Sequence, residues 1–147
     1  MAYSERELLA RLIKCEAGGE GDNGMKAVAA VVMNRVHVPA GEYQRLGQGD
    51  LRKILNQRGQ FDCMTSVLGG NFNAQTIWAS PPEQIHYDIA DWAIAGNAFS
   101  SIGEALWYFN PFQPVCPVTF PRNGSGSIIN KINLHCFYIP TALYWRT

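Results

Sequence analysis

The sequence predicts a single α+β domain spanning residues 1–147, with helices first and a small antiparallel β element after them. Apolar residues recur at the three- and four-residue spacing of helix faces until about residue 95. Beyond that point the helical period stops, and two runs rich in aromatic residues, 106–109 and 134–138, have the composition of strands. We expect these two runs to pair as an antiparallel ribbon beside the helices.

The first helix has clear start and stop signals. Ser4 and Glu7 have the spacing of a capping box, in which the serine hydroxyl accepts a hydrogen bond from a backbone amide one turn on. A glycine pair at 18–19 follows the last periodic residue and ends the helix. Between these limits lies an apolar stripe that is expected to face the core: Leu8, Leu9, Leu12 and Ile13.

Three further helices are expected before residue 98. Their predicted start signals are Asp22 with Asn23, Asp50, and Ser80 with Pro81. The second helix, which runs to about Val36, is apolar nearly all round, as in a central helix with neighbours on several sides. The segments 38–50 and 112–126 are rich in turn-forming residues and are expected to be loops.

Glu16 lies on the apolar stripe of the first helix, because it follows Leu12 by four residues. It also falls in the last turn, where partial burial and the negative end of the helix dipole both raise the pKa of a carboxyl group. A carboxyl that keeps its proton at neutral pH can act as general acid in glycosidic bond cleavage. The alternative is a boundary glutamate whose stem packs on the core while its head reaches water.

Charge and composition exclude some partners. The 12 basic and 12 acidic side chains leave no electrostatic footprint for nucleic acid or an anionic membrane. No stretch of about 18 apolar residues predicts a membrane span, and the first residues lack the features of a secretory signal. The 12% of aromatic residues suit stacking against sugar rings and suit an ordinary core equally. The four cysteines lack the paired spacing of a zinc site, and we expect no metal or other cofactor.

Five motifs together resemble one known family. They are CEAGGEG at 15–21, KAVAAVVMNRV at 26–36, QFDC at 60–63, ALWYFNP at 105–111 and HCFYIPTA at 135–142. In this order and spacing they are similar to the spore cortex-lytic cell wall hydrolase family of the SleB/CwlJ type, and most similar to its short, single-domain CwlJ-like members. The resemblance extends from about Glu7 to Ala142.

The resemblance implies a lysozyme-like fold related to lytic transglycosylases. Glu16 would protonate the glycosidic oxygen between N-acetylmuramic acid and N-acetylglucosamine. The implied substrate is spore cortex peptidoglycan, cleaved at germination by a muramidase or a lytic transglycosylase. The implied location is the boundary of spore coat and cortex, reached without a signal peptide, where spore-coat proteins are candidate partners.

Three residues near these motifs are candidates for contact with substrate. Glu20 lies four residues beyond Glu16, but the intervening glycines interrupt the helix, so we expect it at the cleft rim; a solvated glutamate is the alternative. Gln60 and Phe61 can line the cleft, with the amide bonding an N-acetyl group and the phenyl ring against a sugar face. Simple loop packing explains these two residues equally well.

Three more candidates lie on the expected strands. Tyr108 and Asn110 alternate along the first strand, so they share a face whose polar tips can point into the cleft. Trp107 and Phe109 would then face the core. His135, at the second strand, is a secondary candidate through the family resemblance, although a lone histidine beside a strand more often has a structural role.

Two other functions stay open from the sequence. A cysteine-dependent cell wall peptidase or amidase would use Cys15 or Cys136 as nucleophile and His135 or His86 as base. The carboxylate beside Cys15 disfavours the thiolate that such a mechanism needs. The second alternative is a non-catalytic spore-coat or wall-binding protein that keeps an aromatic groove without turnover.

The cysteines and carboxylates lead to two more predictions. We expect Cys116 and Cys136 to form a disulfide, because both lie in the β-containing part of the chain, and Cys15 to stay a buried thiol. Lytic transglycosylation is favoured over hydrolysis, because no second carboxylate has the spacing of a nucleophile or water activator. The other aspartates near the motifs are explained as caps or turn residues: Asp22, Asp50 and Asp62.

Overall fold

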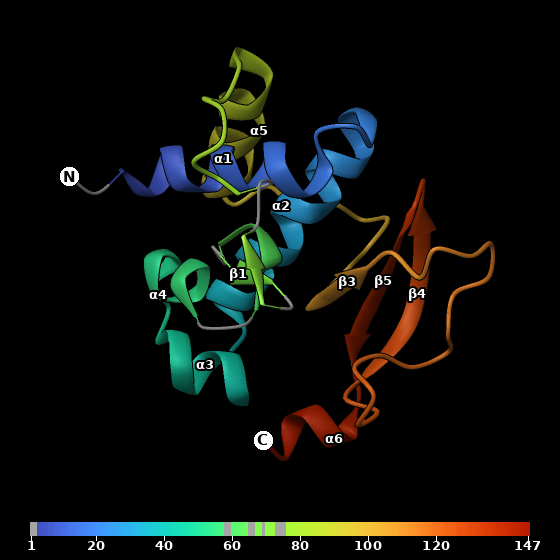
Figure 1. Cartoon of the computed structure of the whole chain (residues 1–147). Coiled ribbons are helices and arrows are strands. Elements are labelled where there is room, and N and C mark those ends of the chain that lie inside the picture. Colours follow the sequence, from blue (N-terminus) through green and yellow to red (C-terminus); the bar gives the residue numbers. More distant parts are fainter. Residues whose placement is uncertain (1–2, 58–59, 65–66, 69, 73–75) are drawn as a thin grey trace.

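The computed structural model describes residues 3–57, 60–64, 67–68, 70–72 and 76–147, and it has the expected α+β architecture (Figure 1). The helices are α1 (Glu5–Ala17), α2 (Gly21–His37), α3 (Glu42–Gly47), α4 (Leu51–Asn56), α5 (Gln84–Ile94) and α6 (Ala142–Trp145), with a 3₁₀ turn, η1, at Asp62–Met64. One small sheet pairs β1 (Val67–Leu68) with β2 (Asn71–Phe72), and a second contains β3 (Trp107–Phe109), β4 (Gly126–Ile132) and β5 (His135–Pro140). Within the described ranges, no helix is both long enough and apolar enough to cross a lipid bilayer.

Helix α2 is the centre of the helical part. It packs against α1 and α5 and, toward its C-terminal end, against α3 and α4, while the three-stranded sheet lies on its other side (Figure 1). Because neighbours surround it, most of its residues are buried, as its Ala- and Val-rich run predicted. The predicted stripe of α1 is buried throughout: Leu8, Leu9, Leu12 and Ile13. This packing fixes the end of α1, and with it Glu16, beside α2.

Two of the predicted helix starts are confirmed. The hydroxyl of Ser4 accepts a hydrogen bond from the amide of Glu7 at 3.1 Å. The carboxylate of Asp50 accepts from the amides of Arg52 and Lys53, at 2.9 and 3.3 Å. Both side chains therefore satisfy amides that the first turn of a helix leaves without a partner.

The predicted caps of α2 are wrong. The helix begins at Gly21, so Asp22 and Asn23 lie inside its first turn, and the N-cap residue is Glu20 without a side-chain cap bond. Asp22 instead forms an ion pair with Lys26 one turn on, at 3.0 Å. The side chain of Glu20 is directed elsewhere, into contacts with the C-terminal sheet.

The predicted start of α5 at Ser80 is also wrong, because the helix begins at Gln84. Prolines disfavour the helical conformation of the residue before them, and two of them follow Ser80. A capping box of Glu83 and His86 starts the helix instead, with the amide of Glu83 donating to His86 Nδ1 at 2.9 Å. A further short helix, α3, lies within the 38–50 segment that was expected to be a loop.

The C-terminal sheet has the strand order β3-β5-β4, and all its neighbours are antiparallel. The predicted pairing of 106–109 with 134–138 is confirmed, with Tyr108 opposite Phe137. The sequence did not predict the third strand, β4. Its residues are mostly polar or half-buried, and a register shift between Ile128 and Asn130 interrupts the alternation that marks a strand.

All four cysteines form disulfides. Cys116 is bonded to Cys136, the predicted pair, and ties the long loop after β3 to β5. Cys15 is bonded to Cys63, 48 positions away, so the prediction that Cys15 stays a thiol is wrong. Bonds over such a separation leave no local sequence pattern. The cysteine peptidase alternative therefore has no free thiol in this structure to act as nucleophile.

Candidate active site

A cleft of about 740 Å³ lies between the helical part and the three-stranded sheet. Its helical wall consists of residues 14–20, Arg35 and 60–63, and its β wall of residues 108–110, Phe112, Phe120 and 134–135. The structure brings all seven candidate residues from the sequence to this cleft: Glu16, Glu20, Gln60, Phe61, Tyr108, Asn110 and His135. Segments that are far apart in the chain thus meet at one site.

Glu16 lies in the last turn of α1 with its carboxyl in the cleft. The pKa of this half-buried carboxyl is raised to about 7, first because burial disfavours its charged form and second because Asp62 is negative. The positive charge of Arg35 and a backbone hydrogen bond from Cys63 act in the opposite direction. A carboxyl with this pKa can both give and take a proton at neutral pH.

Arg35 is a component of the site that the sequence did not single out. The side chain is buried, its Nε donates to the carbonyl of Leu106 at 2.7 Å, and its guanidinium carbon lies 4.4 Å from the ring centre of Tyr43 and 5.0 Å from that of Phe61. These contacts hold a desolvated cation in the helical wall. Its signal in the sequence was that Arg35, together with Asn34, is a polar exception near the end of the apolar run of α2.

Gln60 and Phe61 line the cleft but are largely engaged with the protein. The amide oxygen of Gln60 accepts from Tyr43 Oη at 3.0 Å and from Arg35 Nη1 at 3.4 Å. Phe61 is buried beneath the guanidinium group of Arg35. Both residues therefore shape the helical wall, and the amide nitrogen of Gln60 is the group best suited to meet a ligand.

Glu20 joins the two walls. One carboxylate oxygen, Oε1, accepts from the amide of Leu134 at 3.0 Å and lies 2.9 Å from Nδ1 of His135, while the backbone carbonyl of Glu20 accepts from the side chain of Asn133. Asn133 and Leu134 form the turn between β4 and β5, and His135 is the first residue of β5. The side chain of Glu20 is buried, and its carboxylate is engaged in these contacts. We infer that their main effect is to stabilise the mouth of the cleft.

Tyr108 and Asn110 both line the cleft, but Phe109 between them lines it too, so the predicted alternation of a cleft face and a core face is not observed. The hydroxyl of Tyr108 is buried without a hydrogen-bond partner among the described residues, and burial followed by the charge of Glu16 raises its pKa well above the usual value. Asn110 Oδ1 accepts from the amide of Phe112 at 2.7 Å. Phe109, expected in the core, is half-buried: its ring stacks on Phe120 at 4.1 Å, and both line the cleft.

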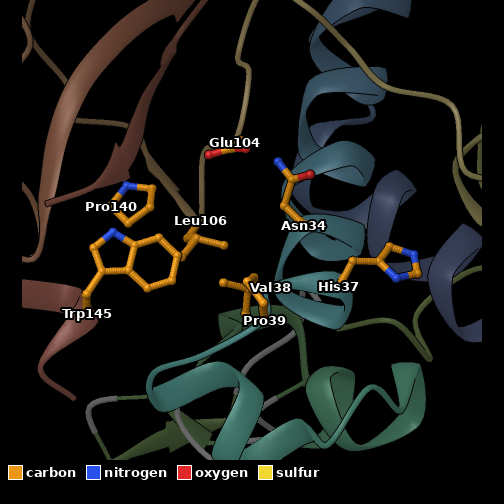
Figure 2. Close-up of a pocket in the computed structure, with 8 residues that line it drawn as sticks. All are labelled: Asn34, His37, Val38, Pro39, Glu104, Leu106, Pro140 and Trp145. Carbon is orange, nitrogen blue, oxygen red and sulfur yellow. The ribbon is translucent and has the colours of Figure 1, made fainter.

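A second, smaller hollow of about 210 Å³ lies at the C-terminal end of α2 (Figure 2). It shares no lining residue with the cleft. The amide nitrogen of Asn34, which lines it, donates to the carbonyls of Gly103 and Ala105 at 3.0 and 2.9 Å. The side chain of Asn34 therefore holds the segment that leads into β3. The candidate active site is the larger cleft, which contains Glu16.

Solved structures with the same architecture define the class of fold. The catalytic domain of the germination-specific lytic transglycosylase SleB from Bacillus anthracis aligns with a TM-score of 0.64 at 24% identity, covering 93% of this chain and 97% of that chain. The catalytic domain of the SleB protein of Bacillus cereus aligns with a TM-score of 0.62 at 25% identity, covering 93% and 92%. The fold is therefore of the lysozyme-like, lytic-transglycosylase-like type.

Sequence relatives then identify the family. The sequence model described as cell wall hydrolase matches residues 19–138. The cell wall hydrolase CwlJ of Bacillus subtilis is 31% identical over 136 residues, which cover 92% of this chain and 85% of that protein. CwlJ of Oceanobacillus iheyensis is 30% identical over 141 residues, covering 95% and 89%. The chain belongs to the cell wall hydrolase family and is an enzyme that acts on peptidoglycan, as the motifs predicted.

Proposed function

We propose that this enzyme cleaves the glycan strands of spore cortex peptidoglycan during germination, with Glu16 as general acid and then as general base. The observation that carries the proposal is the half-buried carboxyl of Glu16 in the cleft, whose pKa is raised to about 7. The family match begins three residues after Glu16, so its role rests on this geometry. The setting is supported by the SleB structure, whose protein is a germination-specific lytic transglycosylase.

The proposed reaction is lytic transglycosylation. Protonated Glu16 donates its proton to the glycosidic oxygen, and the bond from that oxygen to the anomeric carbon of the muramic residue breaks. The Glu16 carboxylate then accepts the proton of the muramic 6-hydroxyl as that oxygen bonds to the anomeric carbon. One strand gains a free hydroxyl, the other ends in 1,6-anhydromuramic acid, Glu16 regains its proton, and no water is consumed.

The surroundings of Glu16 support both halves of this cycle. Burial and the negative charge of Asp62 favour the protonated form, which the first half needs. Arg35 and the backbone of Cys63 favour the carboxylate, which forms as the glycosidic bond breaks. A pKa near the working pH is the compromise that a group acting first as acid and then as base requires.

Hydrolysis is the alternative outcome, and one observation favours it. Asp62 is exposed in the cleft and its charge acts on Glu16, so a second carboxylate belongs to the same site. Inverting glycosidases use such a second carboxylate to activate water. Glu20 is less suited to that role, because its Oε1 is bonded to the turn between β4 and β5.

We further propose that the enzyme works at the boundary of spore coat and cortex, with spore-coat proteins as partners. This location follows from the resemblance to cortex-lytic enzymes. Immunogold labelling of sectioned spores and of sectioned vegetative cells tests it directly. Label confined to the vegetative cell wall would contradict the proposed location but would leave the proposed reaction unaffected.

Digestion of purified cortex peptidoglycan, followed by mass spectrometry, tests the reaction. We expect fragments that end in 1,6-anhydromuramic acid with the natural sequence and none with Glu16→Gln. Glu5→Gln, an exposed position on the same helix, is the matched control and should keep full activity. Products carrying one added water per cleavage would assign hydrolysis. Full activity of folded Glu16→Gln would overturn the assignment of the acid.

A further inference from the structure

We propose that the Cys15–Cys63 disulfide is a positioning element of the active site, which holds Asp62 and the backbone of Cys63 against the carboxyl of Glu16. The proposal rests on the proposed role of Glu16 as the acid. It assigns to the bond a role in the chemistry beyond the stability that any disulfide confers.

The positions of the two cysteines carry the first step. Cys15 immediately precedes Glu16, and Cys63 immediately follows Asp62. The bond joins segments 48 positions apart and holds their Cα atoms 6.2 Å apart. All four residues line the cleft. The covalent link therefore lies directly beside the proposed acid on one side and beside its carboxylate neighbour on the other.

The segment that the bond holds has little structure of its own. Asp62–Met64 is a single 3₁₀ turn, and one such turn does not fix its position relative to a helix. The carbonyl of Cys63 accepts from the amide of Ile77 at 3.0 Å, which ties the turn to the following segment, and the backbone hydrogen bond from Cys63 to Glu16 is its contact with the end of α1. The disulfide is the covalent connection between the turn and the end of α1.

The groups that face Glu16 come from three elements. Asp62 on η1 raises the pKa of Glu16, while Arg35 on α2 and the backbone hydrogen bond of Cys63 lower it. Tyr108 on β3 is neutral in the working pH range, because its own pKa is raised well above the usual value. Burial is the largest influence and Asp62 the next. Release of the turn weakens both influences that raise the pKa, and it also loosens the Cys63 hydrogen bond, which is the smallest of the four and lowers the pKa. The net effect is therefore a lower pKa and a more readily lost proton.

The second disulfide provides a matched control. Cys116–Cys136 closes a separation of 20 positions, and neither of its cysteines lines the cleft. Removing either bond is expected to lower stability, because each disulfide constrains the unfolded chain. Only loss of the Cys15–Cys63 bond is expected to change how Glu16 titrates.

The test is the pH profile of kcat/KM on solubilised cortex glycan between pH 5 and pH 9, measured at a temperature where each variant is folded. For the double variant Cys15→Ser, Cys63→Ser, we expect the alkaline limb to move to lower pH by roughly 0.5–1 unit. For Cys116→Ser, Cys136→Ser we expect an unmoved limb. An unmoved limb in the first variant, or an equal shift in both, would overturn the proposal.

Asp62→Asn keeps the proposal testable if the first double variant does not fold. With the disulfide intact and the charge removed, the limb should again move to lower pH; an unmoved limb would overturn the proposal. Glu16→Gln separates the two hypotheses. If Glu16→Gln is active, the proposed function fails. If it is inactive but the alkaline limbs of the Cys15→Ser, Cys63→Ser and Asp62→Asn variants do not move, only the positioning role fails.

Discussion

The helical wall of the cleft contains buried polar groups that are bonded to other protein groups, whereas the β wall includes aromatic rings that reach the cleft surface. On the helical wall Arg35 is 4% exposed and Glu20 is 9% exposed, and both are hydrogen-bonded. On the β wall Phe112 is 89% exposed, and Phe109 and Phe120 stack on each other at the cleft surface. We infer that the helical wall sets the protonation chemistry and the β wall supplies faces for sugar rings.

Two glutamates on the helical wall illustrate the same division on a smaller scale. Glu16 and Glu20 are four residues apart, yet the first keeps a raised pKa and the second is bonded to the opposite wall. The glycine pair between them ends the helix, so the two carboxyls do not share a face. Their surroundings, rather than their residue type, distinguish the proposed acid from a glutamate that is engaged in structural contacts.

Replacing the proposed acid, Glu16, should have the largest effect on catalysis. If the helical wall sets the protonation chemistry, Glu16→Gln should lower kcat/KM by at least about 10²-fold, the usual contribution of a general acid. The same change should raise stability at pH 8, because the wall no longer has to bury an ionised carboxyl there. Initial rates on cortex glycan and urea unfolding measure the two effects.

The sign of the stability effect follows from proton binding. The folded-state pKa of Glu16, about 7, lies above its ordinary value of 4.5, so between these values the folded state binds more protons than the unfolded state. Stability in the natural sequence therefore falls as pH rises from 4.5 to 7. The advantage of Glu16→Gln should be near zero at pH 4 and about 1–3 kcal/mol at pH 8. An advantage independent of pH would contradict this account.

Breaking the link between the walls should have the next largest effect. Glu20→Ala leaves the amide of Leu134 and the ring of His135 without their acceptor, so we expect a loss of about 1–3 kcal/mol in the free energy of unfolding. Glu20→Gln keeps one acceptor oxygen and should lose less. Urea unfolding at pH 7 compares the two variants. Equal stability of Glu20→Ala and the natural sequence would indicate that the turn is held without this contact.

Local signals predicted the parts of the fold that depend on local interactions. The capping residue Ser4 and the stripe that follows it define α1 and position Glu16 in its last turn. The aromatic run at 106–109 identified β3. The predicted start of α2 was wrong: the helix begins at Gly21, and the side chain of its N-cap residue, Glu20, bonds to a turn 114 positions away and does not cap the helix.

Contacts between distant segments account for what the sequence did not reveal. Arg35 bonds to Leu106, 71 positions along the chain, so its charge in an apolar run could be noticed but its partner could not be predicted. The Cys15–Cys63 bond and the influence of Asp62 on Glu16 likewise depend on tertiary packing. Asp62 was interpreted as a turn residue, and it does lie in a turn. Its effect on Glu16 depends on the tertiary structure and could not be predicted from the sequence.

Removing an exposed ring should have the smallest effect and should act on the β wall alone. Phe112 has φ +55°, in the left-handed region that bulky residues rarely adopt, and the side chain of Asn110 holds its amide there. A ring that is 89% exposed at the cleft surface contributes little to folding. For Phe112→Ala we therefore expect the free energy of unfolding to stay within about 0.5 kcal/mol. We expect KM for glycan to rise by roughly 3–10-fold, as for loss of one stacking contact, with kcat almost unchanged.

The neighbouring loop residue Val115 provides the control for this last prediction. It is 75% exposed but does not line the cleft, so Val115→Ala should leave both KM and kcat as they are. Steady-state kinetics on solubilised glycan of defined length separates the two variants. A fall in kcat with KM unchanged for Phe112→Ala would move this ring from substrate binding to the chemical step, and the division between the two walls would then be wrong. Equal KM values for all three proteins would leave Phe109 and Phe120 as the rings that the substrate meets on the β wall.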